Sequence, residues 1–267
     1  MEQKAKTVST FANLPFEVTA AAEKSAQMGL VTLETDLTIE TEMRHFLSGA
    51  PGHNDASGVA LLHTRIACDD QVTAENLSLM EGRFADALAL FPKDYTFEVI
   101  GYGCTSASLV IGEARVQQII QSNADVAHVT TPLTAAKRGL AALNVARIGY
   151  LAPYISEISH QMCDEFGAAG FAVSAAATFG EGRDSVVGCI RPASILQAIG
   201  ALVDLDPLLE AVFVSCTSLK CAPIIANAER QFGIPVVSSN SAIAWDMARL
   251  AGVRVSATGK GSLFHCE

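Results

Sequence analysis

The chain of 267 residues is long enough for one or two domains with a large buried core. Half of its residues are hydrophobic and only 17% are charged, a composition that excludes a disordered chain. The net charge of −10 argues against nucleic acid or an anionic membrane surface as a partner. Because no apolar run reaches the length of a membrane span and the first residues lack the apolar centre of a signal peptide, we expect a cytoplasmic protein.

The first 26 residues read as an N-terminal arm, either mobile or a short helix that lies across a neighbouring chain. Together with the high apolar content, this arm favours a homo-oligomer, a dimer or a tetramer. The seven cysteines are odd in number and scattered, and no Cys-x-x-Cys pair occurs. This pattern argues against a disulfide scaffold and against a zinc site.

Apolar runs and helical patterns alternate along the whole chain, which predicts an α/β fold with parallel strands. The expected strands are 27–33, 58–66, 97–102, 125–129, 147–151, 170–177, 211–215 and 234–238. The expected helices are 38–48, 73–91, 106–121, 132–144, 155–168, 192–203, 219–232 and 241–251. In such a fold the binding crevice lies at the carboxyl ends of the strands.

A coarse internal repeat divides the chain into two similar halves. Polar loops at 32–36 and 152–156 each follow a strand, and later in each half a strand runs into Cys-Thr-Ser, with Cys104 and Cys216 112 residues apart. If a pseudo-two-fold axis relates the halves, the two motifs face each other across one cleft. The predicted domains are 27–131 plus 240–267 and, between them, 132–239.

The two Cys-Thr-Ser loops combine a thiol with groups that can hold an anion. Each cysteine is expected at the start of a helix, where free N–H groups lower the pKa of a thiol from about 8.5. The same N–H groups and the neighbouring hydroxyls can hold a substrate carboxylate. The predicted carboxylate-binding hydroxyls are those of Thr105, Ser106, Thr217 and Ser218.

A single cysteine at a strand end is more often a small buried hydrophobe than a catalyst. The duplicated motif favours catalysis instead, because a packing accident would not recur at matching places. With two opposed thiols, one removes a proton from carbon or adds to carbon, and the other returns a proton on the opposite face. This chemistry is cofactor-independent racemisation, epimerisation or cis–trans isomerisation. The remaining cysteines are interpreted as structural: Cys68, Cys163, Cys189, Cys221 and Cys266.

The segments "YGCTSASLVIGE", "TTP", "YLAPY" and "FVSCTSL" resemble the Asp/Glu racemase superfamily. Within it, the chain is most similar to the branch of maleate cis–trans isomerases and arylmalonate decarboxylases, especially to ectoine-utilisation members. The resemblance implies two flavodoxin-like, Rossmann-like domains with the active site between them and no cofactor. It also implies that Cys104 and Cys216 are the catalytic cysteines and that Tyr154 contacts a substrate carboxylate.

Two positions depart from the pattern of the isomerases. Asp36 and Asp184 stand near the places where the isomerases have asparagines that bind the substrate. An asparagine amide donates to a carboxylate, whereas an ionised aspartate accepts from an ammonium group. The substitutions argue against maleate and favour an amino acid or an ectoine-derived diamino acid. Alternatively, Asp36 caps the helix at 38–48, and Asp184 is a solvated turn residue, which is the preferred interpretation for Asp184.

The leading hypothesis is therefore a cofactor-independent isomerase or racemase of a small carboxylate. One alternative is an arylmalonate-type decarboxylase, although that reaction requires only a single cysteine. A second alternative is a non-enzymatic sensor of a small ligand, because two lobes can also close on a ligand without chemistry. A third is a redox role for the two thiols.

Overall fold

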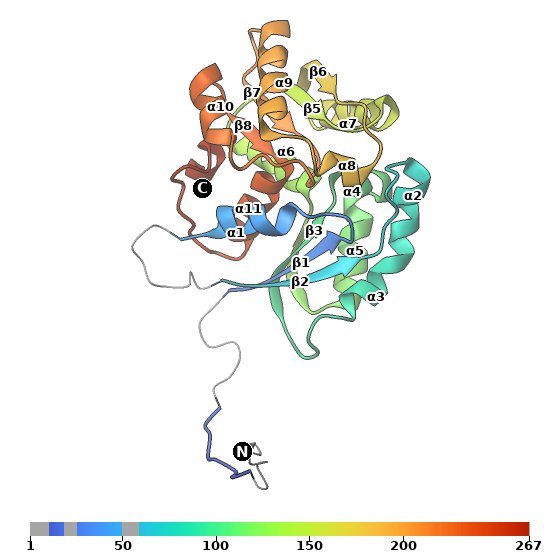
Figure 1. Cartoon of the computed structure of the whole chain (residues 1–267), viewed down its shortest axis with the longest axis vertical. Helices are drawn as coiled ribbons and strands as arrows, with labels where there is room; N and C mark the ends of the chain where they lie inside the picture. Colours follow the sequence, from blue (N-terminus) through green and yellow to red (C-terminus); the bar gives the residue numbers. More distant parts are fainter. Residues whose placement is uncertain (1–10, 19–25, 50–58, 267) are drawn as a thin grey trace, which may run out of the picture.

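The computed structural model describes residues 11–18, 26–49 and 59–266 (Figure 1). Two four-stranded parallel sheets form the centres of two α/β halves. The first sheet has the order β2-β1-β3-β4, with β1 (Ala26–Leu33), β2 (Val59–Ile66), β3 (Phe97–Gly103) and β4 (Val126–Thr130). The second has the order β6-β5-β7-β8, with β5 (Arg147–Ala152), β6 (Ala172–Thr178), β7 (Ala211–Val214) and β8 (Val236–Ser238).

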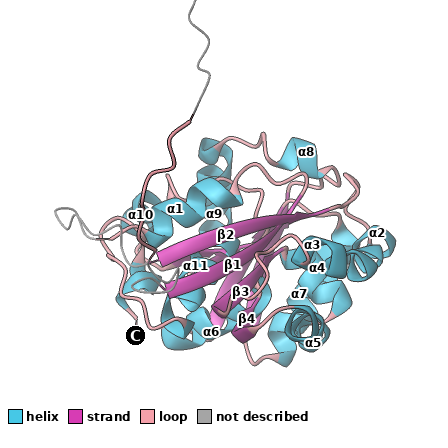
Figure 2. Cartoon of the chain, turned by 90° about the horizontal axis from the view of Figure 1, so that it is seen from below, coloured by secondary structure: helices cyan, strands magenta, loops and turns pink. Residues whose placement is uncertain are grey.

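Helices connect the strands and cover the sheets. Figure 2 shows them on both sides of the first sheet, with α1 and α11 on one side and α3 and α5 on the other. The helices are α1 (Ile39–Leu47), α2 (Ala74–Leu79), α3 (Phe84–Leu88), α4 (Thr105–Ile111), α5 (Glu113–Asn123), α6 (Pro132–Ala142), α7 (Ser156–Ala168), α8 (Asp184–Val187), α9 (Pro192–Leu205), α10 (Ile225–Phe232) and α11 (Ser239–Leu250). Two short 3₁₀ helices, η1 (Met80–Arg83) and η2 (Ser262–His265), complete the described elements.

The predicted α/β fold is confirmed. The central strands β3 and β7 are nearly all apolar and buried, as expected when helices cover both faces of a parallel sheet. Both sheets have the same strand order, with the first strand of each half beside the second and the third. The residues that follow the equivalent central strands, β3 and β7, therefore lie at the carboxyl-terminal edge of the sheet in both halves.

Three predicted helices have different boundaries in the structure. The helix expected at 106–121 is broken at Gly112, whose φ of +91° is unfavourable for other residues. The stretch 73–91 divides into α2, η1 and α3, with Gly82 in the 3₁₀ segment. The helix expected from residue 219 begins only at Ile225, because Pro223 restricts the residue before it to non-helical backbone.

The end of the chain returns to the first half. Helix α11 packs against α1, α6 and β3, so the segment after β8 contributes to the core around the first sheet. Of the predicted N-terminal arm, residues 11–18 are irregular and exposed, and most of the remaining arm lies outside the described residues. The exact domain division stays a prediction. Within the described part of the chain, no helix is both long and apolar enough to cross a membrane.

Candidate active site

Cys104 and Cys216 line the same enclosed cavity between the two halves. The cavity volume of about 20 Å³ leaves room for little more than one water molecule, so the structure represents a closed arrangement. Asp36 and Ser218 are not among the residues that line it. The other predicted site residues do line it: Cys104, Thr105, Ser106, Tyr154, Asp184, Cys216 and Thr217.

Cys104 is the N-cap residue of α4, as the sequence predicted. The backbone N–H of Ala107 donates to its Sγ at 3.3 Å, and the hydroxyl of Ser106 lies 3.6 Å from the same sulfur. Burial nevertheless raises the pKa of the Cys104 thiol to about 12, because the two donors lower it by less than burial raises it. The N–H at the helix start does lower this pKa, as expected, but the expected net fall below the usual value is wrong because burial outweighs it.

Cys216 is held by different means. Its φ of +98° lies in a region that residues other than glycine rarely adopt. No helix begins beside Cys216, since α10 starts at Ile225. Its backbone N–H donates to the Ser239 hydroxyl at 3.0 Å. Burial, followed by the nearby charge of Asp184, raises the pKa of the thiol well above its usual range. The prediction that both cysteines start a helix is thus wrong for Cys216, and Cys221, expected on that helix, lies in the turns before it.

Two hydrogen-bonded links join the loops. The Thr105 hydroxyl lies 2.8 Å from the Ser239 hydroxyl, which in turn accepts from the backbone of Cys216. The Thr217 hydroxyl donates to the carbonyl of Gly103, the residue before Cys104, at 3.2 Å. The hydroxyls of both Cys-Thr-Ser motifs therefore fix one loop against the other in the closed state, and their predicted role in binding a carboxylate stays a prediction.

Asp184 is a buried residue of the site, so its interpretation as a solvated turn residue is wrong. It is only 4% exposed, and it is the first residue of α8. Its carboxylate accepts hydrogen bonds from the hydroxyl of Ser218, at 2.9 Å, and from that of Thr35. Burial raises its pKa, whereas both hydroxyl donors lower it. Ser218 thus supports Asp184 instead of lining the cavity.

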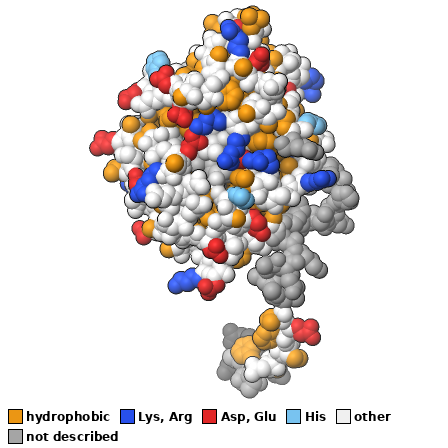
Figure 3. All heavy atoms as spheres, turned by 180° about the vertical axis from the view of Figure 1, so that it is seen from behind, with side chains coloured by type: hydrophobic (Ala, Val, Ile, Leu, Met, Phe, Trp, Pro, Cys, Tyr) orange, Lys and Arg blue, Asp and Glu red, His pale blue; other side chains and the backbone are white. Residues whose placement is uncertain are grey.

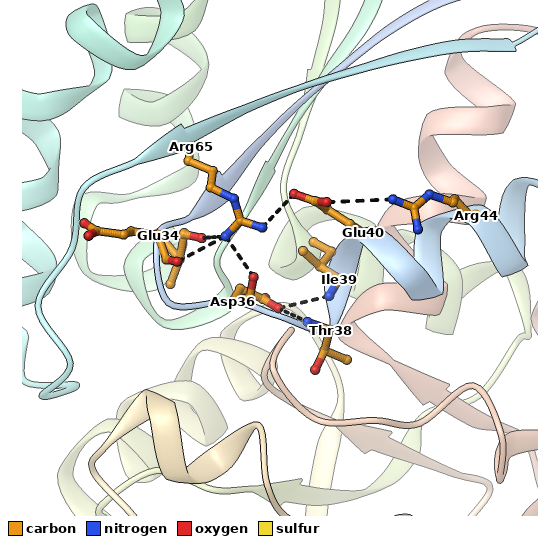
Figure 4. A network of polar contacts seen from close by, with 8 residues as sticks. Glu34, Asp36, Thr38, Ile39, Glu40, Arg44 and Arg65 are labelled. Atoms are coloured by element: carbon orange, nitrogen blue, oxygen red, sulfur yellow. Dashed lines mark hydrogen bonds and ion pairs between the residues drawn. The ribbon is translucent and has the colours of Figure 1, made fainter. Parts of the chain in front are cut away.

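Asp36 closes the turn between β1 and α1. Its Oδ1 accepts from the backbone N–H groups of Thr38 and Ile39 at 2.7 and 2.9 Å, so its helix-capping role is observed. Arg65 supports the same turn by donating to the Asp36 carbonyl at 3.0 Å (Figure 4). The other carboxylate oxygen, Oδ2, is buried and makes no hydrogen bond of good geometry among the described residues, although the Thr217 hydroxyl lies near enough to lower the pKa of the carboxyl group. Burial raises the pKa of this carboxyl group.

Tyr154 follows β5 and lies against the cavity. It is 2% exposed, and its hydroxyl accepts a hydrogen bond from Ser215 at 3.5 Å. Burial raises its pKa well above the usual range, so the phenol stays protonated. A neutral phenol beside the cavity can donate a hydrogen bond to a substrate oxygen.

A strap that pairs segments from the two halves borders the cavity, and sequence reasoning missed it. Residues Gln71 and Arg183 form an antiparallel bridge, and Val72 N–H donates to the Gly182 carbonyl at 2.8 Å. The carboxylate of Asp70 accepts from Ser185 N–H at 2.8 Å. No periodic pattern in the sequence marks such pairing, because it joins two irregular loops 112 residues apart.

Glu42 and Asn240 form a second support that sequence reasoning missed. The carboxylate of Glu42 accepts from the backbone N–H of Ala222 at 2.7 Å and from the side chain of Asn240 at 2.9 Å. The same Asn240 amide donates to the Thr217 carbonyl at 2.8 Å, directly after Cys216. Burial raises the pKa of Glu42 to about 7. An acidic residue inside a helix gives no sign of this role in the sequence.

Cys68, interpreted as structural from the sequence, also lines the cavity, and its Sγ lies 3.4 Å from the Thr35 hydroxyl. The lining includes the carboxylates of Asp69 and Asp184 but no lysine, arginine or histidine among the described residues. Figure 3 shows basic side chains at the surface, mixed with acidic and apolar ones. Within the described ranges, no group of three or more potential ligands is placed to hold a metal ion.

Comparison with known proteins identifies the family of the chain. Residues 78–264 match the arylmalonate decarboxylase family. The chain belongs to this family. It is 29% identical to a maleate isomerase of Nocardia farcinica, over 89% of this chain and 94% of that protein. It is also 29% identical to an arylmalonate decarboxylase of Bordetella bronchiseptica, over 51% of this chain and 57% of that protein.

Solved structures show the same fold. A Nocardia farcinica maleate cis–trans isomerase variant with a covalently bound succinylcysteine intermediate has a TM-score of 0.80 and 28% identity, over 90% of this chain and 98% of that one. An arylmalonate decarboxylase structure has a TM-score of 0.69 over 90% of this chain and 100% of that one. At 21% identity, this second likeness shows the fold alone. The closer resemblance to ectoine-utilisation members stays a prediction.

Proposed function

We propose that the protein is a cofactor-independent isomerase or racemase of a small carboxylate, with Cys104 and Cys216 as its catalytic pair. The observation that carries this proposal is that the duplicated motif brings both thiols to one closed cavity. The similarity to maleate isomerases over about nine-tenths of the chain supports an isomerase. A closed site excludes water, which protects a carbanionic intermediate from protonation by solvent.

Cys104 is the better candidate for the thiolate. Its sulfur accepts the Ala107 N–H and lies beside the Ser106 hydroxyl, and both groups stabilise a negative charge on sulfur. Burial and then the charges of Asp184 and Asp36 raise the pKa of Cys216 well above its usual range, although the backbone N–H of Ser218 lowers it. Cys216 is then the thiol that supplies a proton, and Tyr154 donates to a substrate carboxylate.

Two reactions use this arrangement. In the first, the Cys104 thiolate removes a proton from the carbon next to the carboxylate, the electron pair moves into the carboxylate, and Cys216 returns a proton to the opposite face. In the second, the thiolate adds to a double bond, the carbon–carbon bond rotates, and elimination of the thiolate restores the double bond. The succinylcysteine in the Nocardia farcinica relative is the species that addition of a thiol to maleate forms, which supports the second reaction.

A decarboxylase is the second candidate, because the matching family is that of arylmalonate decarboxylase. In that reaction one carboxylate leaves as CO₂ and a single thiol protonates the remaining enediolate. The second cysteine would then have no chemical task. Stoichiometric release of CO₂ without two-way interconversion of the substrate would favour this candidate over the isomerase.

The test is to incubate the protein in D₂O with maleate, fumarate, arylmalonates and a panel of L- and D-amino acids that includes diamino acids derived from ectoine. Proton NMR reports isomerisation and exchange at the α-carbon. We expect interconversion of at least one compound and its loss in the Cys104→Ser and Cys216→Ser variants. Cys163→Ser, in α7 and away from the cavity, is the matched control. A protein that binds members of the panel but converts none would be a sensor.

A further inference from the structure

One turn of the first half contacts two second-half elements of the site. In this turn, which joins β1 to α1, the hydroxyl of Thr38 donates to the carbonyl of Ser218, two residues after Cys216, at 2.9 Å. The hydroxyl of Thr35 donates to the carboxylate of Asp184, the first residue of α8. The β1–α1 turn therefore holds both the second catalytic loop and α8 in the closed site.

The guanidinium group of Arg65, in the neighbouring strand β2, organises this turn (Figure 4). Its Nη1 donates to the carbonyls of Leu33, Glu34 and Asp36 at 2.9, 3.1 and 3.0 Å, so its two hydrogens are shared among three acceptors. Its Nη2 donates to Oε1 of Glu40, in the first turn of α1, at 2.8 Å. Carbonyl dipoles that converge on one point repel one another, and a cation at that point stabilises the arrangement.

A comparison with Arg44 shows that the contacts with the carbonyls, and not the ion pair, set Arg65 apart. Both arginines pair with Glu40, Arg44 at 3.9 Å and Arg65 at 2.8 Å. The side chain of Arg44 is 68% exposed and that of Arg65 is 40% exposed, and an exposed ion pair contributes little to stability. An Arg65→Lys change would supply one nitrogen where the guanidinium group supplies two, so it could not hold the carbonyls and Glu40 at the same time.

The hydrogen bonds of Arg65 do not depend on contact between the halves, because all its partners in the described chain belong to the first half. The cavity holds little more than one water molecule, so the site has to open before a carboxylate substrate binds. Opening separates Thr35 and Thr38 from their partners in the second half, whereas the bonds of Arg65 stay intact. The turn therefore keeps the conformation that receives the second catalytic loop when the site closes again.

We propose that Arg65 is a positioning residue of the active site and acts through the β1–α1 turn on the loop that carries Cys216. This assignment rests on the proposed function, in which Cys216 is a catalytic thiol. Arg65 is not one of the described residues that line the cavity, so it acts without touching the substrate. It fixes the carbonyls of the turn, the turn fixes the Thr38 hydroxyl, and that hydroxyl holds the carbonyl of Ser218.

The same turn carries a charge that acts on Cys216. Asp36 is fully buried in the turn, and its charge is one of the causes that raise the pKa of the Cys216 thiol. A turn that loses Arg65 no longer fixes the distance between this carboxylate and the thiol. Loosening the turn therefore both exposes Cys216 and lowers its pKa, and each change makes the thiol more reactive.

The first experiment needs no substrate. It measures alkylation of Cys216 and Cys104 by iodoacetamide, from peptide masses, in the parent, Arg65→Gln and Arg44→Gln proteins. We expect Arg65→Gln to accelerate alkylation of Cys216 roughly 10-fold or more, the value of a lost hydrogen bond to a charged group, with a smaller effect on Cys104, which its own helix holds. Arg44→Gln is the matched control and should change neither rate. No acceleration at Cys216, or an equal one at both thiols, would overturn the proposal.

A double-variant comparison tests whether Arg65 acts through the turn. Thr38→Val removes the hydroxyl that holds Ser218 and should accelerate alkylation of Cys216 by itself. If Arg65 acts through Thr38, adding Arg65→Gln to Thr38→Val produces less further acceleration than Arg65→Gln alone, whereas fully additive effects contradict this path. Thr38→Val keeps Arg65, so an unchanged rate in this variant contradicts the proposal even where Arg65→Gln does not fold.

The second experiment uses whichever compound the protein converts. Because Arg65 does not contact the substrate, Arg65→Gln should lower kcat more than it raises KM, and a change in KM alone would overturn the positioning role. The Arg65 side chain is partly exposed, so ethylguanidinium added to Arg65→Ala should restore part of kcat. Equal rescue by ethylammonium would show that charge alone matters, which contradicts the role of the two nitrogens. If the protein converts no compound of the panel, the isomerase function fails, while the alkylation rates still decide the role of Arg65.

Discussion

The loops that carry Cys104 and Cys216 have the same Cys-Thr-Ser sequence but differ in backbone and surroundings. Cys104 has an extended backbone, with φ of −145°, and caps α4, so a backbone N–H of its own helix reaches its sulfur. Cys216 has a φ of +98° and is held through its backbone by Ser239, a residue of another element. The first loop is supported locally, whereas the second depends on distant groups.

This difference teaches how one motif can supply two chemical roles. Burial raises the pKa of both thiols, and donors reach both sulfurs: Ala107 and Ser106 at Cys104, and the backbone N–H of Ser218 at Cys216. The charge of Asp184 raises both pKa values, and that of Asp36 also raises the pKa of Cys216, which favours the neutral form there. A pair of thiols in two-sided proton transfer needs one of each form at a time. The duplicated halves thus provide two similar strand ends. The loops that follow these strands make the surroundings of the two thiols different.

The largest expected effect comes from removing the thiols one at a time. Cys104→Ser and Cys216→Ser should each lower interconversion by a factor of about 10²–10⁴. Cys216→Ser should retain exchange of the substrate proton with D₂O, because the thiolate that removes it remains. Cys104→Ser should lose exchange as well. NMR in D₂O measures both quantities, and the reverse pattern would assign the thiolate to Cys216.

The next effect concerns pH, because the second loop depends on Glu42, a buried acid with a raised pKa. Glu42 has a pKa of about 7 in the folded state against 4.5 for the free group, so the folded protein retains this proton over a range in which the unfolded chain has lost it. The contribution of Glu42 to stability is therefore present below pH 4.5 and is lost as the pH rises to about 7. The free energy of unfolding should fall by on the order of 3 kcal/mol across this window.

Denaturant unfolding between pH 4.5 and 8 measures this change, with Glu42→Gln as the comparison. Glutamine does not titrate, so the variant should lose that part of the pH dependence. Glu40→Gln is the control, because Glu40 lies on the same helix but is more exposed and pairs with Arg65 at 2.8 Å. Equal pH dependence in the parent and Glu42→Gln would show that Glu42 does not support the second loop in this way.

A smaller effect is expected from Ser239, which links the loops. Ser239→Ala leaves the buried N–H of Cys216 without its acceptor and removes the partner of the Thr105 hydroxyl. An unsatisfied buried donor costs about 1–3 kcal/mol, which thermal or chemical unfolding would detect. Activity should fall as well, since the position of Cys216 is no longer fixed. Ser241→Ala, in the capping box of α11, tests whether any hydroxyl of this segment has the same effect.

The fold was largely predictable because the alternation of apolar strands and helical patterns is a local property of the sequence. The strands are found within about two residues of their predicted positions, as with β3 and β7. The prediction that the halves bring Cys104 and Cys216 together depended on the repeated motif and on the resemblance to a known family. The helix boundaries failed where single residues, Gly112 and Pro223, override the periodic pattern.

The electrostatics of the site were not predictable, because they depend on burial and on partners from distant segments. A cysteine at a helix start suggests a lowered pKa, but full burial of Cys104 reverses the direction. Asp184 stands in a Gly- and Arg-rich stretch typical of a solvated turn, yet it is buried and accepts hydrogen bonds from Thr35 and Ser218. The positive φ of Cys216 has no sign in the sequence either, since glycine or asparagine would be expected there.

The smallest predicted effect tests that backbone difference directly. Glycine adopts a φ of +98° without strain, so Cys216→Gly should be more stable than Cys216→Ala by up to about 1 kcal/mol, although both lose the thiol. At Cys104, where φ is −145°, glycine has no such advantage and its extra freedom in the unfolded chain should make Cys104→Gly the less stable variant. Chemical unfolding of these four variants gives two differences of opposite sign. If the differences have the same sign, the two loops do not differ in backbone strain, and the asymmetry of the thiols then depends on their neighbours alone.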